Sequence, residues 1–222
     1  MKPAAGSQWP QFVVVEGPIG VGKSALARKL AERFGSTATL ERSDDNPFLE
    51  RFYADRKRGA LPAQLFYLFN RASDLDLLRQ DDMFSPVRVA DFLIARDRLF
   101  AEINLDADEL KLYDQVAASL DIEIPNPDLV IYLQAPVATL RARINARNPQ
   151  SGSQFDDAYL EQVADAYTGF FFAYDESPLL IVNVAAFDPV ANSADFDALF
   201  EQIMRSRRGR HFFNPITSAA MP

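Results

Sequence analysis

The chain contains no cysteine and a single histidine, His211, among its 222 residues. Disulfides, thiolate metal sites, a cysteine nucleophile and a histidine-rich metal centre are therefore excluded. No apolar run approaches the roughly 18 residues of a membrane span, and residues 1–10 lack the apolar segment of a signal peptide. Positive charge is also scarce, because 23 Lys and Arg oppose 31 Asp and Glu and leave a formal net charge of −8. We therefore expect a cytoplasmic protein with no general affinity for nucleic acid or membranes.

The apolar residues are arranged in two alternating kinds of segment. Strands are predicted near residues 11–16, 37–41, 86–92, 127–135 and 177–184. Segments with apolar residues at helical spacing lie between them. Strands that alternate with helices predict an α/β fold with a five-stranded parallel sheet covered on both faces. We expect one domain over residues 11–207, a flexible N-terminus at 1–10 and a loosely held tail at 208–222.

A glycine-rich loop follows the first predicted strand and opens a predicted helix. It reads Gly17, Pro18, Ile19, Gly20, Val21, Gly22, Lys23 and Ser24. This order matches G-x-x-x-x-G-K-[ST], whose backbone N–H groups surround a polyphosphate. Lys23 is expected to reach the β- and γ-phosphates, and Ser24 to ligate Mg²⁺. The loop predicts a P-loop NTPase that binds ATP and Mg²⁺, without defining the reaction.

Glu41 ends the second predicted strand. Ligands of α/β proteins bind at the edge where parallel strands end. A carboxylate at this edge could take the proton from an attacking hydroxyl. An ordinary surface glutamate is the alternative.

The residues after Glu41 resemble the deoxynucleoside kinase family, in particular its bacterial members. Residues 45–55 read DNPFLERFYAD and are similar to a run in those members. Tyr53, Gln64 and Arg71 follow at the family's spacing of eleven and seven residues. The resemblance covers roughly residues 12–204. It implies a nucleoside-kinase-like three-layer sandwich with a helical lid, which transfers the γ-phosphoryl group of ATP to the 5′-hydroxyl of a deoxynucleoside, with purines favoured.

The same resemblance implies roles for individual residues. Glu41 would be the general base on the 5′-hydroxyl, and Tyr53 would contact the sugar 3′-hydroxyl. Gln64 would hydrogen-bond the base edge, and Arg71 would help to read the base. Candidates to sandwich the base are Phe66, Phe69, Phe92 and Phe100, with core packing as the alternative for each.

The third predicted strand departs from the family pattern. It ends Ala90-Asp91-Phe92 where the family places Glu-Arg-Ser, so the arginine that steadies the transferred group is absent there. Asp91 could instead serve Mg²⁺ or its water shell, and Arg42 could replace the missing arginine. Arg96 stands where the family commonly has a base-reading aspartate. We therefore expect that Arg71 has no aspartate partner and that Arg42 and Arg96 are candidate substrate contacts.

Residues 141–155 resemble the arginine lid of the family. Arg143 and Arg147 lie four residues apart on one predicted helix face and would neutralise charge on the phosphoryl oxygens during transfer. A solvated basic helix face is the alternative. Pro149 and Gly152 stand where the family has an arginine and a glutamate.

Three functions remain open from the sequence. The first is a deoxynucleoside kinase of nucleotide salvage, a homodimer by the same resemblance, that acts on a small-molecule deoxynucleoside. The second is a catalytically weak nucleotide-binding or regulatory protein of the same fold, because several family residues are replaced. The third is a kinase with a changed acceptor, such as a nucleoside monophosphate.

Overall fold

A computed structural model of the chain describes residues 10–42, 45–80, 87–120, 125–147 and 155–215. Its centre is a sheet of six parallel strands in the order β2-β3-β1-β4-β5-β6. The strands are β1 (Phe12–Glu16), β2 (Ala38–Thr39), β3 (Arg88–Ala90), β4 (Leu129–Gln134), β5 (Leu179–Asn183) and β6 (Arg210–Phe213).

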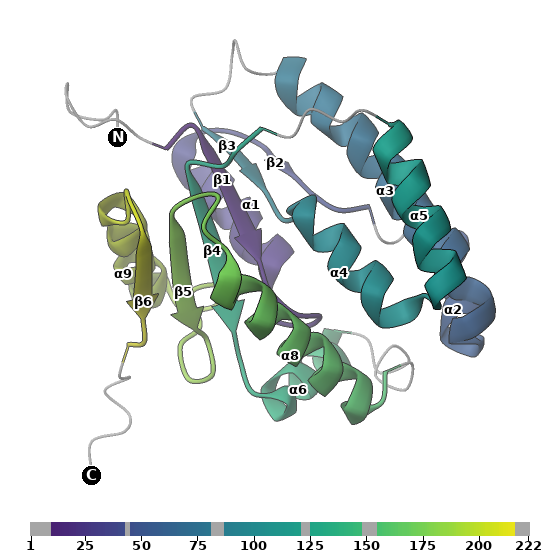
Figure 1. The fold of residues 1–222 in the computed structure, drawn as a ribbon. Coiled ribbons are helices and arrows are strands. Elements are labelled where there is room, and N and C mark those ends of the chain that lie inside the picture. The colour runs from purple at the N-terminus through teal and green to yellow at the C-terminus, as the bar shows by residue number, and fades with distance from the viewer. Residues whose placement is uncertain (1–9, 43–44, 81–86, 121–124, 148–154, 216–222) are drawn as a thin grey trace.

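Helices cover both faces of this sheet, as Figure 1 shows. They are α1 (Lys23–Phe34), α2 (Leu49–Ala54), α3 (Arg56–Gln80), α4 (Ala95–Asn104), α5 (Ala107–Ser119), α6 (Val137–Arg147), α8 (Asp157–Ala173) and α9 (Ser193–Arg205). Helices α1 and α9 lie behind the sheet in this view, whereas α4 and α8 lie in front and α5 packs beside α3 and α4. Across the described ranges, no helix is both long enough and apolar enough to cross a membrane.

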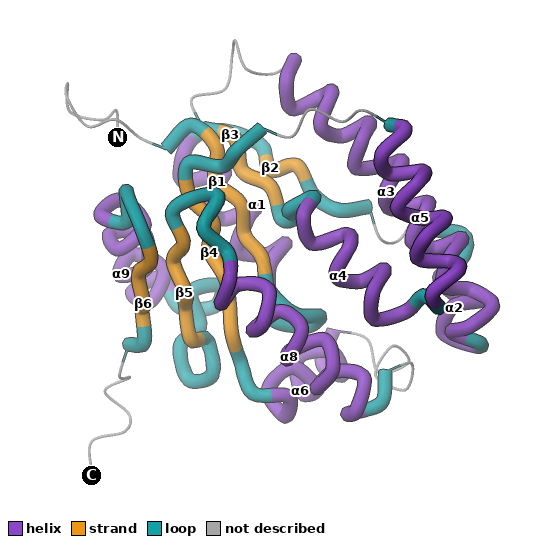
Figure 2. The backbone as a smooth tube through the Cα atoms, in the orientation of Figure 1, coloured by secondary structure: helices purple, strands orange, loops and turns teal. Residues whose placement is uncertain are grey.

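The predicted α/β fold with a parallel sheet is confirmed, but the sheet has six strands and not five. The sixth, β6, pairs with β5 at the edge of the sheet (Figure 2). The expectation of a loosely held chain from residue 208 is therefore wrong for residues 210–213. The sequence does not predict this strand, because its side chains are exposed or partly exposed and its neighbours are basic. An edge strand is held mainly through its backbone hydrogen bonds. The second strand is shorter than predicted and ends at Thr39, so Glu41 lies in the loop that follows.

The side chains of β1 alternate between two hydrophobic cores. Val13 and Val15 pack in the core under α1 and α9, whereas Phe12 and Val14 pack in the core under α4 and α8. Because successive side chains of a strand point to opposite faces, Glu16 belongs to the α4 and α8 side. The strand thus places a carboxylate inside the second core, directly before the phosphate loop.

The central position of β1 also places the loop. Its neighbours are β3 on one side and β4 on the other. The chain leaves β1 toward β2 and β3 and only later crosses to β4. This reversal opens the crevice in which α/β sheets bind ligands, beyond the carboxyl ends of the strands.

The docking of β6 gives a stability prediction. The Arg210 guanidinium donates to the carbonyls of Phe171, Phe172 and Tyr174 at 3.1, 2.9 and 3.0 Å, and so satisfies the end of α8. We expect Arg210→Ala to lower the free energy of unfolding by about 1–2 kcal/mol, measured by urea denaturation. The matched control is Arg208→Ala, which removes an exposed arginine of the same basic run and should cost less than about 0.5 kcal/mol. Equal losses in the two variants would contradict this account.

Candidate active site

The phosphate loop has the backbone that its glycines predict. Gly20 and Gly22 adopt φ of 82° and 105°, which favour glycine. A Cβ at Gly20 would come within 2.6 Å of the Ile144 side chain, so α6 packs directly against the loop. Among the described residues, no side chain caps the start of α1, and a Cβ at Gly22 would meet nothing within 4 Å. The N–H groups of this turn therefore fit a phosphate group.

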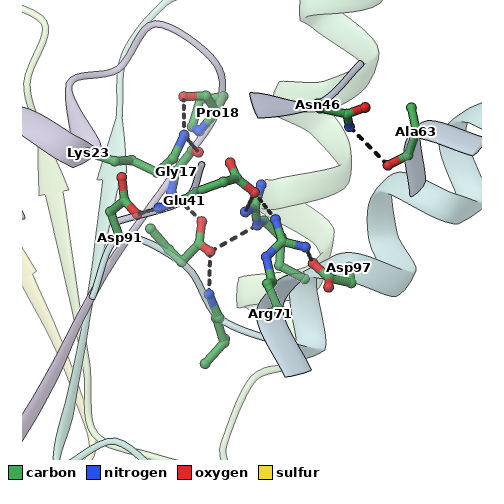
Figure 3. Close-up of polar contacts among 12 residues, drawn as sticks. Gly17, Pro18, Lys23, Glu41, Asn46, Ala63, Arg71, Asp91 and Asp97 are labelled. Carbon is green, nitrogen blue, oxygen red and sulfur yellow. Dashed lines mark hydrogen bonds and ion pairs between the residues drawn. The ribbon is translucent and has the colours of Figure 1, made fainter. Parts of the chain in front are cut away.

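Lys23 lies over this loop. Its ammonium donates to the carbonyls of Gly17 at 2.9 Å and Pro18 at 3.3 Å (Figure 3). Burial lowers the pKa of Lys23, and the carboxylate of Glu16 opposes this effect. A partly buried ammonium gains more from an anionic partner than a fully exposed one, so Lys23 stays a candidate to bind phosphate oxygens.

Glu41 lies beside the loop and is held through its backbone. Its N–H donates to Oδ1 of Asp91 at 2.7 Å (Figure 3). Asp91 is buried and directly follows β3. The Glu41 side chain keeps 18% of its surface exposed, so its carboxylate can still meet a ligand. The structure thus brings Lys23, Glu41 and Asp91 together at the ends of neighbouring strands.

Two guanidinium groups face the Glu41 carboxylate. Oε1 accepts from Arg71 and, at 2.9 Å, from Arg96. Arg71 also forms an ion pair with Asp97, and both side chains are buried (Figure 3). The expectation that Arg71 lacks an aspartate partner is therefore wrong. Successive residues of a helix differ by about 100° in direction, so Arg96 can face Glu41 while Asp97, one position later on α4, faces α3.

Arg96 is in turn paired with Glu16, whose Oε1 lies 3.0 Å from Nε of Arg96. Burial alone would lower the pKa of Arg96, but Glu16 and Glu41 together raise it well above its usual value. Burial, and then the like charge of Arg96, lowers the pKa of Arg71. Charges of alternating sign therefore run from Glu16 through Arg96, Glu41 and Arg71 to Asp97.

Arg42 does not share this arrangement. Its guanidinium pairs with Asp74 of α3 at 2.7 Å, and about half of the side chain is exposed. Burial raises the pKa of Asp74, and Arg42 opposes the rise. The structure thus brings Arg96, and not Arg42, to the carboxylate of Glu41.

The predicted base- and sugar-binding residues come from α2, α3 and the end of β3. Gln64 is buried on α3, and the Arg71 guanidinium lies 5.9 Å from the centre of the buried Phe92 ring. Tyr53 is partly buried and meets the ring of Phe155 edge-on at 5.2 Å.

The other three candidate phenylalanines lie in different surroundings. Phe100 lies under the Arg96 guanidinium at 5.1 Å, and Phe66 packs edge-on against Phe48. Phe69 is half exposed, which argues against a place in a base sandwich.

The lid arginines have different surroundings. Arg143 donates to the carbonyls of Val21 at 3.0 Å and Val184 at 2.8 Å, and so ties α6 to the phosphate loop and to the end of β5. Arg147 is exposed at the last position of α6. The replaced lid positions, Pro149 and Gly152, lie outside the described residues.

Sequence reasoning missed four residues near the site. Glu16, Asp97, Tyr167 and Asn46 are all buried, and Asn46 donates to the carbonyl of Ala63, next to Gln64 (Figure 3). Of these four, Glu16 could have been singled out from the sequence, because it is an acidic residue at the end of an otherwise apolar strand. The partners of the other three depend on contacts between distant segments and left no pattern in the sequence.

A parallel α/β sheet with this loop between β1 and α1 defines the P-loop class. A solved structure of deoxyadenosine kinase from M. mycoides, with products dCMP and a flexible dCDP bound, shares the fold with a TM-score of 0.73 at 21% identity, over 86% of this chain and 98% of that chain. Deoxyguanosine kinase of Bacillus subtilis is 32% identical over 85% of this chain and 93% of its own length. Deoxyadenosine kinase of Lactobacillus acidophilus is 30% identical over 82% and 89%.

The family model for deoxynucleoside kinase matches residues 13–206. The chain therefore belongs to the deoxynucleoside kinase family and is an enzyme that phosphorylates deoxynucleosides.

The buried Arg71–Asp97 pair predicts a large effect of removing one partner. Asp97→Asn leaves the buried guanidinium of Arg71 with less compensation, and we expect a loss of about 3 kcal/mol in unfolding free energy. Asp114→Asn is the matched control, because it breaks an exposed pair with Arg98 and should cost less than about 1 kcal/mol. Urea denaturation of both variants measures the difference, and similar losses would refute the assignment of Asp97 as the buried partner.

Proposed function

We propose that the chain transfers the γ-phosphoryl group of ATP to the 5′-hydroxyl of a purine deoxynucleoside and releases a deoxynucleoside monophosphate and ADP. The observation that carries this proposal is the position of Glu41, partly exposed beside the phosphate loop and held by Asp91 and two guanidiniums. The names of the curated relatives, deoxyguanosine and deoxyadenosine kinases, support a purine acceptor.

On the donor side, the backbone of residues 17–24 binds the triphosphate, and Lys23 binds the β- and γ-phosphates. Arg143 and Arg147 of α6 offset charge on the phosphoryl oxygens. Ser24 and Asp91 would hold Mg²⁺, which when bound supplies positive charge to the phosphates. The described residues contain no group of three or more His, Cys, Asp or Glu that could hold a metal ion.

On the acceptor side, Glu41 takes the proton of the 5′-hydroxyl as that oxygen bonds to the γ-phosphorus. The bond from the γ-phosphorus to the bridging oxygen breaks, and ADP leaves with the bond's electrons. Arg96 is held at the Glu41 carboxylate, where it can also stabilise the phosphoryl group.

Base and sugar are read by groups farther along α2 and α3. Tyr53 contacts the 3′-hydroxyl, Gln64 and Arg71 hydrogen-bond the base, and Phe92 packs against it. Because Asp97 holds the Arg71 guanidinium, the donors of Arg71 are presented in one orientation, which suits recognition of a base edge. We further propose that the protein is a homodimer and that it serves nucleotide salvage in the cytoplasm.

An acceptor panel tests the reaction. With ATP and Mg²⁺, we expect ADP release to rise with deoxyadenosine or deoxyguanosine, and less with ribonucleosides and pyrimidine deoxynucleosides. A coupled ADP assay and phosphate-transfer product analysis measure this. Stimulation by monophosphates alone would replace the proposal with a changed acceptor. ATP binding without turnover on any acceptor would indicate a nucleotide-binding protein.

Glu41→Gln tests the base. We expect kcat to fall by about 10²–10⁴-fold, because the amide cannot accept the proton, while the affinity for ATP changes little. The measurement is kcat beside ATP binding by thermal shift. Glu50→Gln, an exposed change on α2, is the control and should retain full activity. A Glu41→Gln variant with wild-type kcat would remove Glu41 from the mechanism.

A further inference from the structure

Glu16 is a fully buried carboxylate with no direct part in the proposed reaction. Its Oε2 accepts from the N–H of Gly17 at 3.1 Å and from the hydroxyl of Tyr167 at 3.0 Å. Its Oε1 accepts from the N–H of Leu93 at 2.7 Å and lies 3.0 Å from Nε of Arg96. Within the described chain, every one of these partners is a donor or a cation, so the ionised carboxylate suits all of them.

These partners come from separate parts of the fold. Gly17 opens the phosphate loop, Leu93 precedes α4, Arg96 lies on α4 and Tyr167 lies on α8. A buried charge is expensive, and an apolar residue could fill the same space more cheaply. Stability alone therefore does not explain a glutamate at the end of an apolar strand.

Arg96 connects Glu16 to the acceptor site. Its Nε faces Glu16 and its Nη2 donates to Glu41, so the planar guanidinium spans the two carboxylates. The same Glu16 carboxylate accepts from Gly17. One carboxylate therefore contacts both the first residue of the phosphate loop and the arginine that binds Glu41.

We propose that Glu16 is a positioning residue, which acts through Arg96 to hold Glu41 in register with the phosphate loop. This inference rests on the proposed function, since it gives Glu41 the role of the base. Displacement of a reacting group by about 1 Å can cost about 10²-fold in rate. A residue that fixes the position of the Glu41 carboxylate therefore affects turnover more than binding.

Glu16→Gln tests the inference on the full-length chain. The amide has nearly the same shape, and its oxygen can still accept from Leu93, but the charge opposite Arg96 is lost. We expect kcat to fall by about 10- to 100-fold, with KM for the deoxynucleoside and the affinity for ATP within about threefold of wild type. Tyr167→Phe is the matched control, because it removes a bond to Oε2 and leaves the Arg96 side intact, and its kcat should stay within about threefold.

A double-mutant cycle separates positioning from general support of the fold. If Glu16 acts through Arg96, Glu16→Gln should lower kcat by less than about threefold when Arg96 is already Met. Multiplicative losses, or a wild-type kcat for Glu16→Gln, would overturn the inference. Should Glu16→Gln not fold, Glu16→Asp, which keeps the charge but withdraws it from Arg96, must show the same loss confined to kcat. A wild-type chain that turns over no deoxynucleoside would defeat the proposed function itself, whereas normal turnover with an unaffected Glu16→Gln defeats only this inference.

Discussion

The candidate site depends on a row of buried and partly buried charges of alternating sign. Three carboxylates, of Glu16, Glu41 and Asp97, enclose two guanidiniums, of Arg71 and Arg96. Unpaired, any of these charges would be costly in an interior of low dielectric constant. Each guanidinium instead lies between two carboxylates, so the row is stable only when the ends of β1 and β2 and the helices α3 and α4 all meet. The packing of these elements and the pairing of these charges therefore depend on each other.

The parallel sheet makes this meeting possible. It brings the ends of β1, β2 and β3 to one edge, and the loop after β1 turns into α1 at the same place. Glycine at position 20 lets α6 pack directly on this loop, and Arg143 ties the same helix to the end of β5. Donor and acceptor residues are thus attached to one rigid frame, which is what transfer between two bound substrates requires.

The contacts change the interpretation of two departures from the family pattern, the missing arginine of the third strand and the missing aspartate partner of Arg71. The third strand lacks the family's arginine, yet a guanidinium from α4, that of Arg96, meets Glu41. Arg71 keeps a carboxylate partner, Asp97, one residue beyond the position where the resemblance suggested a loss. Both findings lessen the case for a catalytically weak protein. The lid replacements at Pro149 and Gly152 lie outside the described residues.

The sequence by itself determined the alternation of strands and helices, the phosphate loop and the acidic residue beside it, because periodicity and glycine-rich turns are local properties. Tyr53, Gln64 and Arg71 came from the resemblance to the family, and their roles stay predictions. Only the tertiary structure decided that β6 completes the sheet, that Arg42 pairs with Asp74, and that Arg71 pairs with Asp97. These contacts join segments that are far apart in the chain. Within a helix, the direction of a side chain changes by about 100° with each residue. A shift of one position along a helix therefore gives a side chain a different partner, and neither the composition nor the motifs of the sequence reveal it.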